Sequence, residues 1–306
     1  MDQYIVLKNI ELINANAISG FTYGFPAITH FLGFVHAMSR KLSSVGVEMS
    51  DVAVICHDYC IRAYRNSTFS PYLFSQTRNP LTKNAKVAPI NEEGRMSLRV
   101  SLIVRCNGIN EINETKTRES CALIKSLAEQ QKLAGGRIVS IGSCYLADLQ
   151  RFTLTRLLRS LMPGFVLIDR SDLLQESKKD MLATWLEYCS LQYQAQKIQT
   201  EYEETLVSWN RSNLHQGYIV PLAIGFKAIA QLQEAGSVAN ARDMQTPSRL
   251  VETVFGLAEW VGSPSRIKSI GEILWHYEYQ DPFYITKTGS AIENVDDFYK
   301  SEDDLL

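Results

Sequence analysis

The sequence lacks an excess of charge of one sign and lacks any long hydrophobic run. Its net charge is −2, so the overall charge does not indicate a nucleic-acid partner, and a basic face must be sought locally. No apolar stretch approaches the roughly 20 residues of a membrane span. The chain starts with the acidic Met1-Asp2-Gln3, unlike a signal peptide. We therefore expect a cytoplasmic protein with no membrane contact, and the 45% hydrophobic share is enough for a real core.

The sequence also lacks a cysteine framework and a nucleotide-binding or hydrolase motif. Its 6 cysteines are scattered, which is typical of free thiols in a reducing compartment. Cys56 and Cys60 flank a histidine, but no second pair completes a tetrahedral site, so we expect no metal and no cofactor. The patterns G-x-S-x-G, G-x-x-x-x-G-K-[ST] and G-x-G-x-x-G do not occur. The protein is therefore predicted not to be an enzyme.

His36 is the one histidine in a suggestive setting. It could act as a general base, but such a base needs a partner acid and a phosphate clamp, and no motif ties these to it. We favour a packing or capping role for His36.

Hydrophobic periodicity predicts a βαββαβ unit in the first half of the chain. Residues 95–106 alternate between apolar side chains and a second set that includes Arg95, Arg99 and Arg105. The predicted strands are 4–13, 50–64, 95–106 and 137–142, and the predicted helices are 27–43 and 115–133. This order is typical of the ferredoxin-like or RRM-like arrangement, so the fold class is α+β with a first domain at 1–145.

The second half, 146–306, is predicted to be mixed and largely helical. Residues 172–205 read as helical, a short strand is expected at 218–221, and two helices are expected to begin at Pro247 and Pro264. The first of those two would be apolar on nearly every face. It is therefore either the core of this half or part of a partner interface. The interface hypothesis rests on Trp260, Trp275 and Tyr277.

About thirty extra residues, 65–94, lie between the second and third predicted strands, where a connection of a few residues is usual. Basic side chains alternate there with aromatic ones. The basic residues are Arg65, Arg78, Lys83 and Lys86, and the aromatic ones are Phe69, Tyr72 and Phe74. Such a mixture suits a hairpin that grips a nucleic-acid strand, with cations on phosphates and rings against bases.

Two further groups have two readings each. The face with Arg95, Arg99 and Arg105 is either an RNA surface or a solvated strand face with edge-protecting charges. Asn14, Asn16 and Ser19 either cap a turn or read base edges. The turn at 240–243 reads as an Asx turn with an internal pair of Arg242 and Asp243.

Several short motifs together resemble one known family. They are NANAIS at 14–19, YGFP at 23–26, FLGFVHA at 31–37, TRNPL at 77–81, EEGR at 92–95, LAGG at 133–136, LMPGF at 161–165 and NARDMQTPSRLVETVFGLAEW at 240–260. They occur in the order of the family of the second Csy subunit of the type I-F CRISPR surveillance complex. Members of that family are Cas-five-type proteins that hold the 5′ handle of the CRISPR RNA.

The resemblance implies a non-enzymatic RNA-binding scaffold with a β-hairpin thumb at 65–94. It also implies that the turn at 240–243 lies in the handle-binding region, which is the alternative to a purely structural Asx turn. Its partners would be the CRISPR RNA, a large Cas-eight-type subunit, the Cas-seven-type backbone subunits and, through the complex, target DNA. A metal-independent ribonuclease that processes the guide is the alternative. The expected RNA-binding residues are Asn14, Asn16, Ser19, Phe21, Tyr23, Arg65, Arg78, Asn79, Lys83, Lys86, Arg95, Arg99 and Arg242.

Overall fold

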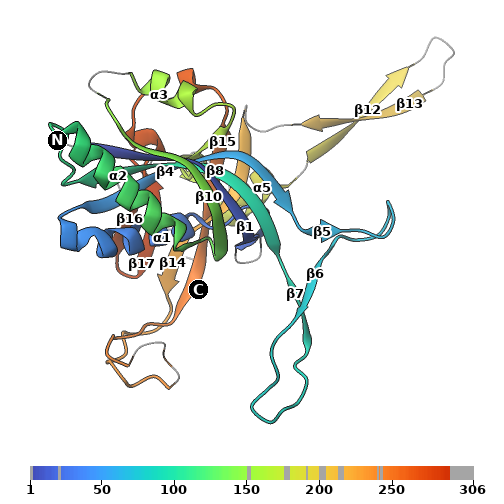
Figure 1. Cartoon of the computed structure of the whole chain (residues 1–306). Helices are drawn as coiled ribbons and strands as arrows, with labels where there is room; N and C mark the ends of the chain where they lie inside the picture. The colour runs from blue at the N-terminus through green and yellow to red at the C-terminus, as the bar shows by residue number, and fades with distance from the viewer. Residues whose placement is uncertain are drawn as a thin grey trace.

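A large antiparallel sheet forms the centre of this mixed α+β protein (Figure 1). The computed structural model describes residues 3–19, 22–149, 153–175, 180–190, 192–199, 205–212, 217–239, 241 and 244–289. Within them, ten strands are hydrogen-bonded in the order β11-β15-β14-β17-β16-β4-β8-β1-β10-β9. The sheet therefore runs through both predicted regions, 1–145 and 146–306.

The predicted elements of the first half are confirmed. The strands are β1 (Gln3–Asn16), β4 (Glu48–Ile61), β8 (Arg95–Asn107) and β10 (Gly136–Ala147), with β9 (Lys132–Leu133) at the edge. The helices are α1 (Ile28–Leu42) and α2 (Glu114–Glu129), and the short η1 (Ser43–Val45) follows α1. Apolar faces of both helices share one core with the sheet, for example through Phe31, Ile124 and Leu102. That burial, more than local propensity, stabilises the helices.

The second half differs from the sequence prediction, because strands dominate its described part. Residues 251–261, predicted as a helix, form strand β15 (Val251–Val261). The second predicted helix is replaced by η2 (Pro264–Arg266), η3 (Gly271–Ile273) and β16 (Trp275–Gln280). The remaining strands are β11 (Phe165–Asp169), β14 (Tyr218–Ala228) and β17 (Phe283–Thr288).

The error has a physical cause. β15 lies between β11 and β14, and its central residues from Gly256 to Glu259 are buried. A strand that is covered on both faces has no polar alternation, so its apolar run reads like a buried helix. The predicted helix at 172–205 is likewise wrong beyond α4 (Asp172–Gln175) and α5 (Met181–Cys189), since β12 (Gln192–Gln199) follows them.

A second core covers the other face of the sheet beside α3 (Leu154–Ser160). Leu157 and Leu158 of this helix belong to the same cluster as Val6 of β1 and Ile103 of β8. The polar-out alternation predicted for 95–106 therefore holds only in its first part, and Ser101 is as buried as its apolar neighbours.

Two slender elements leave the same side of the body (Figure 1). One contains β5 (Ala63–Tyr64), β6 (Leu73–Arg78) and β7 (Ile90–Glu93), and the other is the two-stranded ribbon of β12 and β13 (Thr205–Ser212). A small turn of β2 (Ile18–Ser19) and β3 (Thr22–Tyr23) lies beyond β1. In the part of the chain that the structure describes, no helix is long and apolar enough to cross a membrane.

Candidate nucleic-acid interface

The inserted segment forms a projecting antiparallel hairpin, which we call the hairpin arm (residues 73–93). Its strands pair from Ser75 with Glu93 to Arg78 with Ile90. The turn beyond them is closed by Thr82, whose backbone N–H donates to the carbonyl of Lys86 at 3.0 Å. Four of the predicted RNA-binding residues lie along this arm with exposed side chains, namely Arg78, Asn79, Lys83 and Lys86. Their cations are therefore accessible to phosphates.

Aromatic rings gather at the start of the insertion. The guanidinium of Arg65 lies over the ring of Tyr72, 5.1 Å from its centroid, and its Nη1 donates to the carbonyl of Thr68 at 3.2 Å. Phe69 is 98% exposed, and Tyr64 is also exposed. Exposed rings beside a cation can stack on nucleobases. A bound nucleic-acid strand would also cover their apolar surface, which is otherwise exposed to water.

Asn14 and two arginines build the root of the arm. Asn14 has a left-handed backbone with φ of 58°, next to an irregularity in the pairing of β1 with β8. Its side-chain Oδ1 accepts a hydrogen bond from Arg62 at 2.5 Å, and its carbonyl accepts one from Arg95 at 3.4 Å. Arg95 also forms an ion pair with Glu93 at 2.8 Å. Asn14 and Arg95, which are 81 positions apart in the sequence, are thus brought together here.

Sequence reasoning missed Arg62, although a signal was present. It is the basic residue immediately after β4, directly before the insertion, and its side chain is exposed. A strand end that enters a functional hairpin is a natural place for a side chain that orients the hairpin's root.

The β2–β3 turn packs against this root. The amide of Ala17 donates to the carbonyl of Gly94 at 2.9 Å, and the ring of Tyr23 meets the ring of Phe74 edge-on at 5.4 Å. A Cβ atom at Gly94 would lie 2.5 Å from Cγ1 of Ile18, so this close contact requires glycine or a shift of Ile18. The turn and the arm therefore form one unit.

The two amide and hydroxyl residues of this turn behave differently. The side chain of Asn16 donates to the carbonyl of Ile18 at 2.7 Å and accepts from the amide of Ile18 at 3.1 Å, which is the geometry of a turn cap. Ser19 is buried, and within the described residues its Oγ has no hydrogen-bond partner. Two further predicted RNA-binding residues, Phe21 and Arg242, lie outside the described residues.

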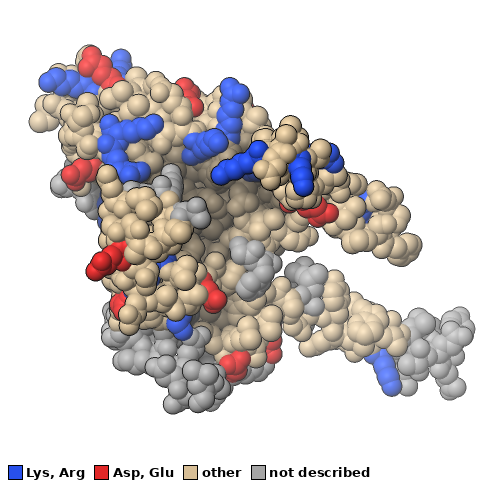
Figure 2. All heavy atoms as spheres, turned by 90° about the horizontal axis from the view of Figure 1, so that it is seen from below, with Lys and Arg blue, Asp and Glu red and all other residues tan. Residues whose placement is uncertain are grey.

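The strand face of β8 is less basic than its sequence suggests. Arg99 is exposed, but its cross-strand neighbours are Glu11 on β1 and Asp58 on β4. Arg105 forms an ion pair with Asp51 at 2.8 Å. Acidic neighbours offset these arginines, which fits the solvated-strand reading for this part of the face. Figure 2, seen from below, shows Lys and Arg side chains on the body and on the projecting insertion along one border of a hollow.

The predicted partner residues divide into two groups. Trp275 is 0% exposed, and its Nε1 donates to the carbonyl of Leu167 at 3.0 Å, so its proposed place on a partner surface is wrong. Trp260 is half-buried with its ring edge-on to Phe25 at 4.8 Å. Tyr277 is half-buried too, and its ring stacks on Tyr284. A contact through Trp260 or Tyr277 stays a prediction.

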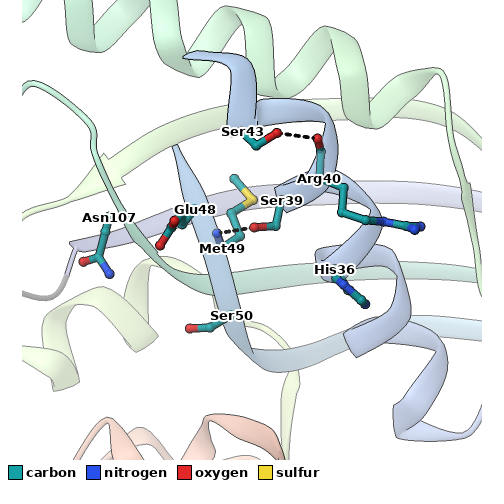
Figure 3. A pocket seen from close by; sticks show the side chains of 8 residues that line it. All are labelled: His36, Ser39, Arg40, Ser43, Glu48, Met49, Ser50 and Asn107. Carbon is teal, nitrogen blue, oxygen red and sulfur yellow. Dashed lines mark hydrogen bonds between the residues drawn. The ribbon is translucent and has the colours of Figure 1, made fainter. Parts of the chain in front are cut away.

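His36 lies on the exposed side of α1, so the favoured packing or capping role conflicts with the structure. It borders a shallow hollow of about 360 Å³ between α1 and the start of β4 (Figure 3). The hollow is lined by His36, Ser39, Arg40, Ser43, Glu48, Met49, Ser50 and Asn107. Ser39 is occupied structurally, because its Oγ accepts from the amide of Met49 at 2.9 Å.

His57, the histidine between Cys56 and Cys60, makes contacts within the fold. One ring nitrogen of His57 lies 2.6 Å from Oγ of Ser101, and the other lies 2.7 Å from the carbonyl of Pro163. A neutral ring can accept from the serine and donate to the carbonyl, and burial, the largest cause, lowers the pKa of His57. Among the described residues, no group of three or more His, Cys, Asp and Glu could hold a metal ion.

Together the fold and the arm define a mixed α+β protein that projects a basic, aromatic β-hairpin from a large sheet. Residues 5–285 match the family described as CRISPR-associated protein (Cas_Csy2). The chain is also similar to the CRISPR-associated protein Csy2 of Pseudomonas aeruginosa (strain UCBPP-PA14), with 31% identity over 91% of this chain and 92% of the relative. The chain therefore belongs to the Csy2 family, and the resemblance found in its sequence is confirmed.

Proposed function

We propose that this protein is a subunit of a type I-F CRISPR RNA-guided surveillance complex and that it binds the 5′ handle of the CRISPR RNA. Membership of the Csy2 family supports the first part. The hairpin arm supports the second and is the observation that carries it, since it exposes Arg78, Lys83 and Lys86 on a narrow projection. Cations on such an element neutralise phosphates without reading sequence.

The root of the arm would hold the RNA next to the sheet. The exposed Arg62 and the half-exposed Arg95 both donate hydrogen bonds to Asn14, whose backbone is left-handed. A ferredoxin-like or RRM-like platform is part of the proposal, and it is supported by the strand order β4-β8-β1-β10 with α1 and α2 in the crossovers. On such a platform, single-stranded RNA is recognised through bases splayed onto aromatic and cationic side chains.

We further propose that the protein caps a filament of Cas-seven-type backbone subunits and pairs with a large Cas-eight-type subunit, next to which target DNA enters. The half-buried Trp260 and Tyr277 are the proposed partner anchors. All 6 cysteines are free thiols, which fits a cytoplasmic complex. Coexpression with the large subunit should raise the soluble yield of the chain. A well-behaved monomer that gains nothing from the large subunit would contradict an obligate pair.

The proposed role is not catalytic. A ribonuclease centred on His36 is the competing function, and the exposure of His36 beside Arg40 in the hollow is the observation in its favour. The two functions separate in a reconstituted system that contains repeat RNA. The scaffold retains bound RNA without cutting it, and His36→Ala leaves guide processing unchanged. Cleavage by the purified chain that His36→Ala abolishes would establish the ribonuclease instead.

RNA copurification is the direct test of handle binding. The full chain, expressed with a repeat array and its partner proteins, should copurify with a short RNA of uniform 5′ end. Handle binding predicts that this RNA is protected from nuclease over its first nucleotides. Isolation of the assembled complex with an unprotected 5′ end would contradict it, and isolation without RNA would favour a DNA-facing role.

A further inference from the structure

The ribbon of β12 and β13 is a two-stranded sheet separate from the large sheet. Its eight-residue strands pair from Gln192 with Ser212 to Gln199 with Thr205. It projects from the same side of the body as the hairpin arm (Figure 1). An isolated two-stranded ribbon is only marginally stable in water, so we expect a ligand to cover one of its faces. The chemistry of each face indicates which ligand that is.

The two faces of the ribbon differ in chemistry. The register places Ala195 opposite Trp209 and Lys197 opposite Val207, with Tyr193 on the same face by alternation. The opposite face carries mostly amides and hydroxyls, such as Gln194 and Ser208, and it also carries the pair of Ile198 with Leu206. On this mainly polar face, Nδ2 of Asn210 donates to Oε1 of Gln196 at 2.7 Å, which adds a side-chain link between the strands. The first face exposes its rings, since Trp209 is 66% and Tyr193 is 55% exposed.

The charge of the two strands favours a polyanion. Neither strand contains Asp or Glu, whereas β12 contains Lys197 and β13 contains Arg211. Lys197 is exposed on the face of the two rings. Rings that stack on bases, together with a nearby cation for phosphate, are the features that bind single strands with little sequence preference. The ribbon and the hairpin arm flank a gap on one side of the molecule (Figure 2).

We propose that the face of the ribbon defined by Tyr193, Lys197 and Trp209 binds single-stranded nucleic acid, with bases stacked on the two rings and a phosphate on Lys197. This site goes beyond the function proposed above, because it uses no residue of the hairpin arm or its root. The connecting segment contains Glu201, Glu203 and Glu204. Carboxylates repel phosphates, so these glutamates work against the binding of a polyanion and allow a test of the proposal.

Trp209 itself provides the readout. The other three tryptophans are less accessible, since Trp185 is 8% and Trp275 is 0% exposed and Trp260 is half-buried. Titrating the full chain with a 12-nucleotide oligouridylate at low salt should therefore quench the exposed-tryptophan fluorescence. Trp209→Phe should remove the quenching and retain most of the binding, measured by anisotropy of a labelled oligonucleotide. Trp209→Ala should weaken it by about tenfold, the loss of one stacked base.

Control variants separate this site from the arm. Gln194→Ala, on the polar face, should leave quenching unchanged, and Arg78→Ala with Lys83→Ala should weaken arm binding but retain the quenching by Trp209. If Trp209→Ala unfolds the ribbon, Lys197→Gln is the alternative variant, because it leaves both rings in place. It should lower the slope of log affinity against log salt by about 0.7. If the arm variants leave RNA affinity unchanged, handle binding by the arm is contradicted, whereas the proposed ribbon site is not affected.

The three glutamates of the connecting segment allow a test that distinguishes a nucleic acid from a protein partner. Changing Glu201, Glu203 and Glu204 together to Gln should raise oligouridylate affinity, because repulsion of phosphates is removed. If the ribbon docks instead on a basic protein surface, the same change weakens assembly and leaves oligonucleotide affinity unchanged. That result, or the absence of quenching in the wild-type chain at low salt, would overturn the proposal.

Discussion

Nε1 of Trp275 donates a hydrogen bond to the backbone carbonyl of Leu167 across 3.0 Å, in a fully buried environment. Trp275 also pairs with Val52 of β4 in the sheet. One side chain thus connects β16 and β11 where both strands join β4, the sheet neighbour from the first half of the chain.

Because of this hydrogen bond, we expect a substitution of Trp275 to lower the stability of the protein strongly without removing a contact to RNA. Trp275→Phe leaves the buried carbonyl of Leu167 without its donor, which should lower the free energy of unfolding by roughly 1–3 kcal/mol. Urea denaturation measures the change. Trp209→Phe, a matched substitution on an exposed ring, should change it by no more than about 0.5 kcal/mol. Equal stability of the two variants would disprove the anchoring role of Trp275.

The hairpin arm predicts a change in the salt dependence of RNA binding. Replacing Arg78 and Lys83 with Ala removes two phosphate contacts, so the slope of log affinity against log salt should fall by about 1.4 for single-stranded RNA. Filter binding of handle RNA at several salt concentrations measures it. Lys116→Ala with Arg118→Ala on α2 is the charge-matched control. An unchanged slope in the arm variant would rule out the proposed phosphate contacts.

Because the backbone of Asn14 is left-handed, we expect its substitution by glycine and by alanine to have different effects on the stability of the fold. Asn14→Gly keeps this backbone accessible and should preserve the fold while weakening RNA binding, because the link to Arg62 is lost. Asn14→Ala adds a backbone cost of roughly 1–2 kcal/mol. Thermal unfolding of both variants distinguishes backbone strain from the lost hydrogen bond. If Ala and Gly behave alike, the conformation of Asn14 is not under constraint.

Two histidines predict a loss of stability at acid pH. Burial is the largest cause that lowers the pKa of His30 and of His57 below the ordinary value of 6.5. The unfolded chain therefore binds more protons than the folded one just below that value. The stability that comes from the neutral rings is complete above pH 6.5 and is lost as the pH falls towards the lowered pKa values.

Melting temperatures between pH 8 and pH 5 measure this effect. The wild type should lose more stability on acidification than His57→Gln, because glutamine does not titrate. Comparing the two proteins at pH 8 isolates the lost contacts to Ser101 and Pro163. Parallel curves for the two proteins would show that protonation of His57 is not coupled to folding.

The first half of the fold and the position of the arm could be predicted from the sequence alone. Strands with one solvated face, such as β8 from Arg95 to Val100, show their alternation directly, and α1 shows its single apolar face. The basic and aromatic residues of 65–94 could be read as a projecting element, because a connection of that length and composition has no core to join.

The second half of the fold and the root of the arm depend on contacts between distant segments, which the sequence did not reveal. β15 is buried between β11 and β14, so no periodicity distinguished it from a helix, and Trp275 became a core residue because distant segments enclose it. The pairing of Arg62 with Asn14 joins residues 48 positions apart, and the acidic neighbours of Arg99 come from two other strands. Such relationships depend on strand register, which is set by packing across the whole sheet and is not encoded in any local run of residues.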